Sequence, residues 1–214
     1  MTLTPIRQHF LIAADAAARL LSDPTVAAHW DEPSALAEFG VRGLAGHLAT
    51  QLFYVRDVLA APEPAGDPVG IDDHYRKAAW MNAPLDAEAN VSVREAGAAQ
   101  AADGAVELSR RAVGAAAGLH EALQLALPDR VVLLPWADRR LRLDDFLLTR
   151  LMEVSVHSDD LAVSVGVPTP LLPDDVLEPV IQLLTGLALR RHGGLPLLRA
   201  LSRRERAPET IAAF

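Results

Sequence analysis

Apolar residues recur every three to four positions along nearly the whole chain, which is the period of an α-helix. Between residues 41 and 61, for example, Val41, Leu44, Leu48 and Leu52 fall on one side of a helix. The same period predicts helices at 3–22, 41–61, 71–82, 88–126, 144–165 and 174–191, with a short element after them. Long helices joined by loops of unequal length indicate a mainly all-α fold, an antiparallel four-helix bundle.

Two features interrupt the helical pattern. Short apolar runs on both sides of Ala137 and Asp138 predict a small hairpin within 130–142. Asp144 follows them and is the predicted N-cap of the next helix, because its side chain can accept a hydrogen bond from a free backbone N–H group. We expect residues 1–168 to form the bundle and residues 169–214 to form a short helical extension packed on it.

Glycines mark weak points in two predicted helices, because each disfavours a helix by roughly 1 kcal/mol. The helix at 88–126 contains four of them, Gly97, Gly104, Gly114 and Gly118. Gly43 and Gly46 lie about one turn apart in the helix at 41–61, which suggests that a neighbouring helix or a ligand approaches closely there.

Composition excludes several classes of function. The formal net charge of −8 argues against a nucleic-acid partner, because an acidic surface repels phosphate. The chain has no cysteine, so disulfides, cysteine nucleophiles and thiolate metal sites are excluded. Neither a signal peptide nor an apolar run of about 18 residues is present, which predicts a cytoplasmic protein without a membrane partner.

The helix at 144–165 carries the most informative polar residues. Glu153 and His157 are four residues apart, so they lie on one face beside the apolar stripe. His47 has the same position beside the apolar stripe of its own helix. Two imidazoles and one carboxylate would form a three-ligand site with an open position, as in catalytic zinc sites, although iron, nickel and cobalt suit the same donors. The spacing also fits a surface pair and a simply hydrogen-bonded histidine, and it does not show that His47 meets the other two.

Two segments resemble a known family. The segment 41–49 (VRGLAGHLA) resembles the histidine-bearing second helix of DinB-like metal-binding bundles, and 150–162 (RLMEVSVHSDDLA) resembles their later Glu-x-x-x-His-x-x-Asp-Leu segment. The pair is most similar to the mycothiol-dependent maleylpyruvate isomerase family. The resemblance implies that His47, Glu153 and His157 bind a divalent metal, commonly zinc, and that mycothiol approaches the open position.

This resemblance leads to a hypothesis for the function. The metal would bind the sulfur of mycothiol as a thiolate, and the thiolate would add to a small electrophilic substrate in an isomerase or transferase reaction. Two alternatives remain, a hydrolase that uses metal-bound water and a non-catalytic metal-binding stress-response protein. The shorter C-terminal part departs from the larger one in the family, which argues against maleylpyruvate itself as the substrate. We expect a monomer or a homodimer.

Further residues have weaker signals. Asp160 lies three residues after His157 and is a candidate to orient its imidazole, while Arg150 lies three residues before Glu153 and is a candidate to orient that carboxylate or the substrate. Gln51, Tyr54, Trp80 and Trp136 are candidates to line a pocket, although packing is the favoured role for each. The arginines after residue 189 form either a solvated face or a site for an anionic group.

Overall fold

The computed structural model describes residues 3–78, 83–84 and 86–214. Its elements, in chain order, are α1 (Pro5–Leu21), α2 (Pro24–Ala28), α3 (Val41–Ala60), α4 (Ile71–Arg76), α5 (Glu88–Gln100), α6 (Ala105–Leu125), β1 (Val131–Leu133), β2 (Arg140–Arg142), α7 (Leu143–Val165), α8 (Asp174–His192), α9 (Gly194–Ser202) and the 3-10 turn η1 (Arg204–Arg206). The predicted mainly helical fold is confirmed.

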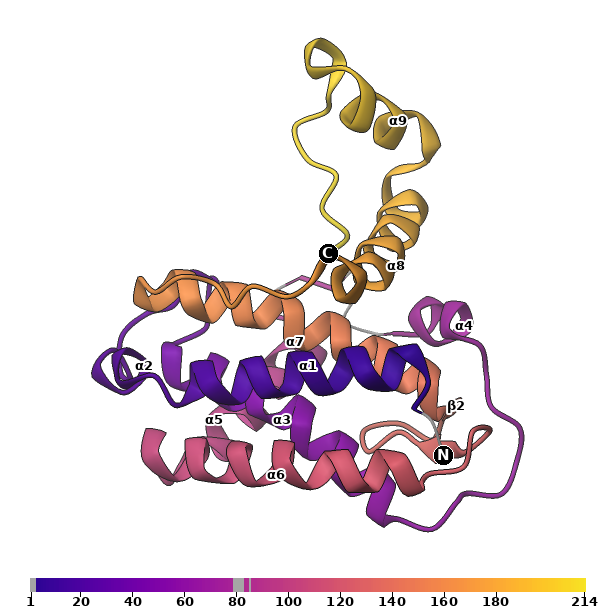
Figure 1. Ribbon diagram of the computed structural model, residues 1–214. Coiled ribbons are helices and arrows are strands. Elements are labelled where there is room, and N and C mark those ends of the chain that lie inside the picture. The colour runs from indigo at the N-terminus through magenta and orange to yellow at the C-terminus, as the bar shows by residue number, and fades with distance from the viewer. Residues whose placement is uncertain (1–2, 79–82, 85) are drawn as a thin grey trace.

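Four long helices form the bundle. α1 packs against α6 and α7, and α3 packs against the same two helices, so each helix has two neighbours (Figure 1). The core between them is built from aliphatic side chains and alanines with few aromatic rings. Ala14 and Ala17 of α1 are fully buried, as are Leu48 of α3 and Leu147 of α7. Small residues let the helix backbones approach closely, which explains how a chain with 5% aromatic residues closes a core.

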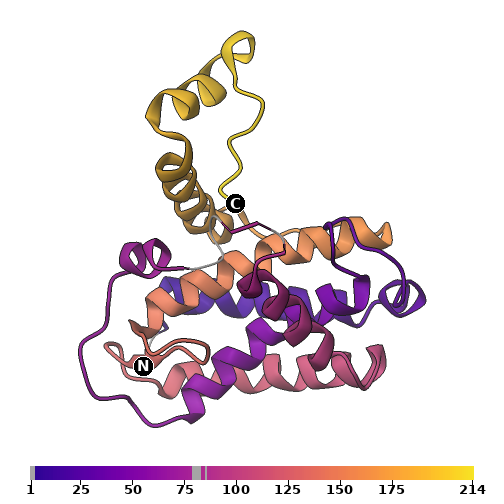
Figure 2. The same ribbon diagram turned by 180° about the vertical axis from the view of Figure 1, so that it is seen from behind.

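The alanine-rich segment 88–126 does not form one helix, which corrects the prediction. It divides into α5 and α6, and Gly104 between them has a φ of 89°, a conformation that L-residues with a side chain rarely adopt. The break lets α5 pack on the outside of α3 while α6 remains in the bundle (Figure 2). The burial gained by two packed segments therefore outweighs the helix propensity of the alanines.

Other predicted boundaries also shift. α4 ends at Arg76, and residues 79–82 of the helix predicted at 71–82 lie outside the described residues. The hairpin is confirmed, because β1 and β2 pair antiparallel with Val132 opposite Leu141. Asp144 is not the N-cap of α7: β2 continues directly into the helix, which places Arg142 at the cap and Asp144 in the first turn.

Arg7 connects three elements of the bundle although it is almost fully buried. Its Nη1 donates to the carbonyl oxygens of Leu123 (3.3 Å) and Ala126 (2.8 Å), and its Nη2 donates to that of Leu127 (2.8 Å). Its Nε donates to Oδ1 of Asp144 at 2.9 Å. Arg7 thus satisfies the free carbonyls at the C-terminal end of α6, where a helix favours positive charge, and links them to the first turn of α7.

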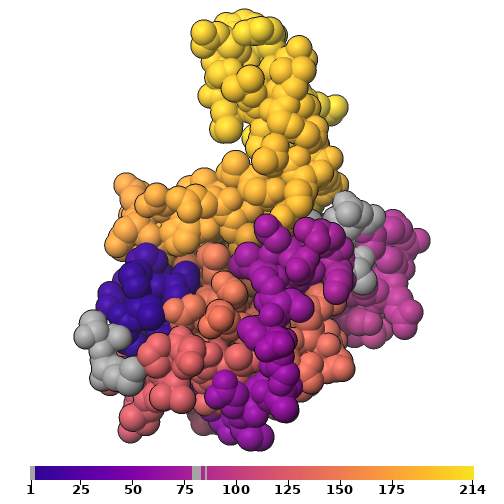
Figure 3. Space-filling model, turned by 90° about the vertical axis from the view of Figure 1, so that its right-hand side faces the viewer, coloured from indigo at the N-terminus to yellow at the C-terminus, as the bar shows by residue number. Residues whose placement is uncertain are grey.

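The C-terminal elements extend away from the bundle. α8 contacts α1 and α7, whereas α9 packs on α8 and η1 and forms the tip of a projecting arm (Figure 3). The predicted division at residue 168 falls between α7 and α8, and it stays a prediction that the two parts are separate units. Within the part of the chain that the structure describes, none of the helices combines the length and the apolar character needed to cross a bilayer.

Candidate metal centre

Two packed helices supply the polar cluster at the centre of the molecule. His47 lies on α3, and Glu153 and His157 lie one turn apart on α7. The predicted apolar stripe of α7 is buried, including Leu151, Val154 and Leu161. Because this stripe packs in the core beside α3, the polar face next to it is turned toward His47. The two helices therefore bring together side chains that are 106 residues apart in the chain.

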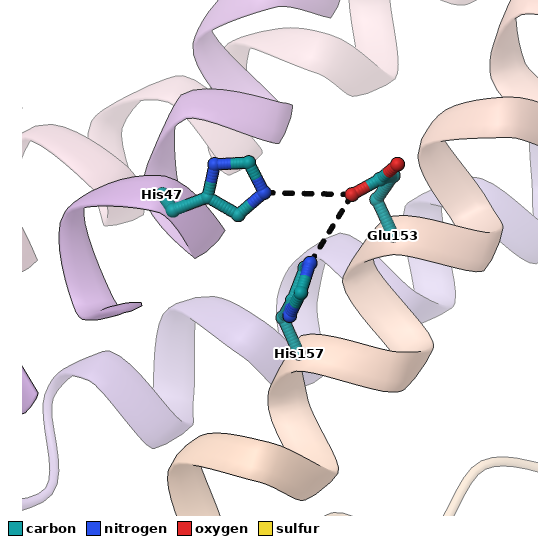
Figure 4. Close-up of side chains that lie close together, drawn as sticks. All are labelled: His47, Glu153 and His157. Atoms are coloured by element: carbon teal, nitrogen blue, oxygen red, sulfur yellow. Dashed lines mark hydrogen bonds and ion pairs between the residues drawn. The ribbon is translucent and has the colours of Figure 1, made fainter. Parts of the chain in front are cut away.

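The three side chains point toward one another (Figure 4). Oε2 of Glu153 lies 3.4 Å from Nε2 of His47 and 3.2 Å from Nε2 of His157. One donor atom from each residue falls within 4.8 Å of the other two. The side chains are 15%, 14% and 17% exposed for His47, Glu153 and His157, so the cluster is largely enclosed and retains a small solvent-accessible surface.

Charge is distributed unevenly in the cluster. Burial raises the pKa of Glu153, but the hydrogen bonds from His157 and His47 and the charge of Arg150 outweigh it and hold this pKa well below its usual range. Burial lowers the pKa of His157, yet its hydrogen bonds to Asp160 and Glu153 reverse the effect and raise the pKa to about 9. Burial is the main cause that lowers the pKa of His47. These directions favour an ionised Glu153 and place a proton on His157 in preference to His47.

Asp160 holds the second nitrogen of His157. Nδ1 of His157 donates to Oδ2 of Asp160 at 2.9 Å, which leaves Nε2 directed at Glu153. A carboxylate in this place fixes the ring orientation and raises the basicity of the imidazole. Its position agrees with the predicted orienting role, and the role itself stays a prediction.

Arg150 does not contact Glu153 as one of its predicted roles requires: among the ion pairs of the described residues, none joins the two. It is buried, and its Nη1 donates to Oε1 of Gln51 while its Nε donates to Oγ1 of Thr149 at 3.0 Å. Its guanidinium also lies 4.7 Å from the ring centroid of Trp136. Arg150 therefore acts on Glu153 through its charge, at longer range than a hydrogen bond.

Gln51 belongs to the site although its sequence context predicts packing. Arg150 fixes the amide oxygen, so the amide nitrogen faces α3, where it donates to the carbonyl oxygen of His47 at 2.9 Å and lies 3.3 Å from Nε2 of His47. The sequence contained a signal for this contact, because Gln51 is a polar residue four positions after His47 and therefore lies on the same helix face. The rings of Trp136 and Tyr54 contact each other at a tilt of 47°, with their centroids 4.8 Å apart. Trp80 lies outside the described residues.

Close contact between α3 and α5 fixes the backbone of His47. A Cβ on Gly97 would lie 2.5 Å from the carbonyl oxygen of Gly43 and 3.2 Å from Cβ of His47, and a Cβ on Gly46 would collide with the carbonyl of Gly97. Only glycine allows this approach. The predicted close neighbour of Gly43 and Gly46 is therefore α5, and its backbone supports the turn of α3 that carries His47.

Comparison with known proteins places this bundle in a family. A sequence model of the mycothiol maleylpyruvate isomerase N-terminal domain matches residues 10–162, which run from α1 into α7 and include all three residues of the cluster. The chain belongs to this family. Among curated proteins, none matches the chain.

One solved structure resembles the structure of this family member. It is described as the crystal structure of the mycothiol-dependent maleylpyruvate isomerase, with a TM-score of 0.52 and 18% sequence identity. The alignment covers 89% of this chain and 72% of that one. At this identity the likeness concerns the fold, and it agrees with the predicted helical bundle.

The cluster of this family member fits a divalent ion. Ligand atoms at ~2.0–2.2 Å from a tetrahedral ion lie about 3.3–3.6 Å from one another. The separations of the Glu153 oxygen from the two histidine nitrogens, 3.2 and 3.4 Å, are close to that spacing, and the three donor atoms all lie within 4.8 Å of one another. Two imidazole nitrogens and one carboxylate oxygen also form a donor set that zinc accepts, as do iron, nickel and cobalt.

The buried side chain of His74 on α4 should make the stability of the protein depend on pH. It is buried, and burial together with the charges of Arg150 and Arg139 lowers its pKa from 6.5 to about 4. As the pH falls from about 6.5 to 4, the unfolded chain takes up a proton that the folded chain does not, so stability falls by at most about 3 kcal/mol. Urea unfolding at several pH values measures the free energy of unfolding of the wild type and of His74→Gln. The difference between the two free energies should change between pH 6.5 and 4. Parallel pH profiles would contradict the lowered pKa of His74.

Proposed function

We propose that the protein is a metal-dependent enzyme that uses mycothiol for an isomerase or transferase reaction on a small electrophilic substrate. The observation that carries the proposal is the convergence of His47, Glu153 and His157, whose donor atoms all lie within 4.8 Å of one another. Membership of the mycothiol maleylpyruvate isomerase N-terminal domain family supports the choice of thiol. The absence of cysteine from the chain agrees with it, because any thiol must then come from a small molecule.

Each residue of the site has a proposed task. His47, Glu153 and His157 hold the metal through Nε2, a carboxylate oxygen and Nε2. When bound, the ion supplies a positive charge that lowers the pKa of a thiol at the open position and keeps a sulfur nucleophile available near neutral pH. The hydrogen bond to Asp160 keeps a proton on Nδ1 of His157, so Nε2 is the nitrogen that gives up its proton when the ion binds.

Arg150 and Gln51 are proposed to position the metal-binding side chains from within the core. The charge of Arg150 adds to the hydrogen bonds from His157 and His47, which together favour the ionised Glu153 that a metal ligand must be. Gln51 holds the turn of α3 at His47 through the backbone carbonyl oxygen of that residue. Both side chains are buried, so they act on the metal-binding residues and leave the solvent-accessible surface of the cluster free for thiol and substrate.

The test is a thiol-dependence assay with the purified, zinc-loaded chain. Maleylpyruvate and a panel of other small electrophiles are incubated with and without mycothiol, and products are followed by NMR. We expect turnover only when mycothiol and metal are both present. Turnover that needs the metal but not the thiol would replace the proposal with hydrolysis, and a metal-loaded protein without turnover on any electrophile would favour a binding protein.

A further inference from the structure

A pocket of about 310 Å³ opens beside the start of α3 and is separate from the metal cluster. Its walls come from the loop between α2 and α3 and from the first turns of α3 and the middle of α5. Trp30 and Phe39 give it two aromatic walls, and Asp31, Glu32, Glu38 and Glu95 give it carboxylates. Arg42 and Arg94 complete the polar lining.

The pocket adjoins the metal cluster. Gly43 lines the pocket and lies one helical turn before His47. The ring of Phe39 forms the boundary between the two, because its centroid lies 6.1 Å from that of the His47 ring. On the α5 side, the pocket residue Ala98 follows Gly97, whose backbone contacts His47. The pocket and the cluster thus occupy neighbouring turns of α3, and a ligand long enough to pass the Phe39 ring would occupy both.

The loop that forms the pocket is held in place by its own hydrogen bonds. The backbone nitrogen of Val41 donates to the carbonyl oxygen of Glu32 at 2.9 Å, and that of Arg42 donates to the carbonyl oxygen of Trp30 at 3.1 Å. The backbone nitrogen of Ala35 donates to Oγ of Ser164 on α7 at 2.9 Å, one turn beyond Asp160. The loop is thus fastened to both helices that carry the metal cluster, which makes the pocket a fixed part of the site.

The lining chemistry restricts the ligand. Four carboxylates face two arginines, so the pocket repels an anion, while the carboxylate oxygens can accept hydrogen bonds from several hydroxyl groups. The aromatic walls suit the apolar faces of a sugar-like ring, and the arginines can donate to ring or hydroxyl oxygens. This combination fits a neutral, polyhydroxylated group better than an apolar or negatively charged one.

We infer that this pocket binds the hydroxyl-rich body of the thiol whose sulfur reaches the metal cluster, an inference that rests on the proposed function. Mycothiol has such a body, since its cysteine is attached to a sugar and a cyclic polyol. The carboxylates of Asp31 and Glu95 hold the hydroxyl groups, and Trp30 and Phe39 enclose the ring. The metal cluster then selects for sulfur, and the pocket selects which thiol is bound.

Calorimetry on the full-length, zinc-loaded chain tests this assignment with two thiols, mycothiol and N-acetylcysteine, which lacks the polyol body. The double variant Asp31→Asn/Glu95→Gln changes two exposed carboxylates of the pocket, and Glu88→Gln changes an exposed carboxylate of α5 outside it. We expect the double variant to bind mycothiol at least about 10-fold more weakly, because two hydrogen bonds to charged carboxylates become weaker bonds to neutral amides. Its zinc content and its affinity for N-acetylcysteine should match those of the wild type and of Glu88→Gln.

The possible failures are distinguishable. A double variant that binds mycothiol as tightly as the wild type overturns the pocket assignment, and so does an equal loss of affinity for both thiols, because that loss would arise at the metal cluster. A wild type that binds the two thiols equally well also overturns it and leaves the proposed function intact. A zinc-loaded wild type that binds neither thiol contradicts the proposed function itself.

Discussion

His157→Ala is expected to leave a folded protein that no longer retains zinc. The substitution removes one of three donors and also the group through which Asp160 acts on the cluster. We expect zinc affinity to fall by more than about 100-fold, beyond the ~10–100-fold that loss of an outer hydrogen-bond partner costs. Competition with a chelator of known affinity measures the change, and thiol-dependent turnover should disappear with the metal.

Two variants make this measurement specific. His120→Ala removes a histidine on α6 that pairs with Asp15 on the surface, so its zinc affinity should equal that of the wild type. Asp160→Asn keeps all three donors and should produce an intermediate loss. Full zinc content in His157→Ala, with an unchanged circular dichroism spectrum, would contradict the assignment of the metal centre.

Arg7→Ala is expected to have the largest effect on stability. The substitution removes hydrogen bonds to three carbonyl oxygens at the end of α6 and leaves Asp144 without its partner in the first turn of α7. Loss of one partner from a buried charged network costs about 3–5 kcal/mol. For a chain of this size, that loss lowers the melting temperature by roughly 10 °C. Chemical denaturation and calorimetry measure both quantities.

Arg19→Ala is the matched control, because Arg19 is an exposed arginine of the same helix. It should change the free energy of unfolding by less than about 0.5 kcal/mol. Equal stability of Arg7→Ala and Arg19→Ala would show that the contacts of Arg7 contribute nothing beyond those of a surface side chain. Zinc affinity serves as a second readout, and it should be unchanged in both variants, since Arg7 does not contact the cluster.

Helix α7 shows which features of the structure can be predicted from the sequence. Its apolar period is regular over six turns, so its extent and its buried stripe follow from local spacing alone. Glu153 and His157 lie on one face for the same local reason. Gln51 could also have been found by this rule, because it follows His47 by four residues, but its buried hydrogen bond to Arg150 depends on how α3 packs against α7.

Predictions were wrong where tertiary contacts compete with local preference. The segment 88–126 has the composition of one helix, yet burial of both its halves favours a break at Gly104. Asp144 has the identity of an N-cap, but the hairpin continues into the helix, and the buried Arg7 uses the carboxylate instead. Arg150 is a different case: it contacts the amide of Gln51 and the ring of Trp136, no ion pair of the described residues joins it to Glu153, and its predicted role toward the substrate stays a prediction.

The sequence by itself determined the helical class, the hairpin, the faces of the long helices and the identity of the candidate donors, because each follows from the spacing of nearby residues. Only the tertiary structure decided that His47 reaches Glu153, that Gln51 contacts both His47 and Arg150, and that a polar pocket lies one turn away. These contacts join segments about a hundred residues apart, and their formation depends on which helix faces pack together in the core, a property of the whole chain.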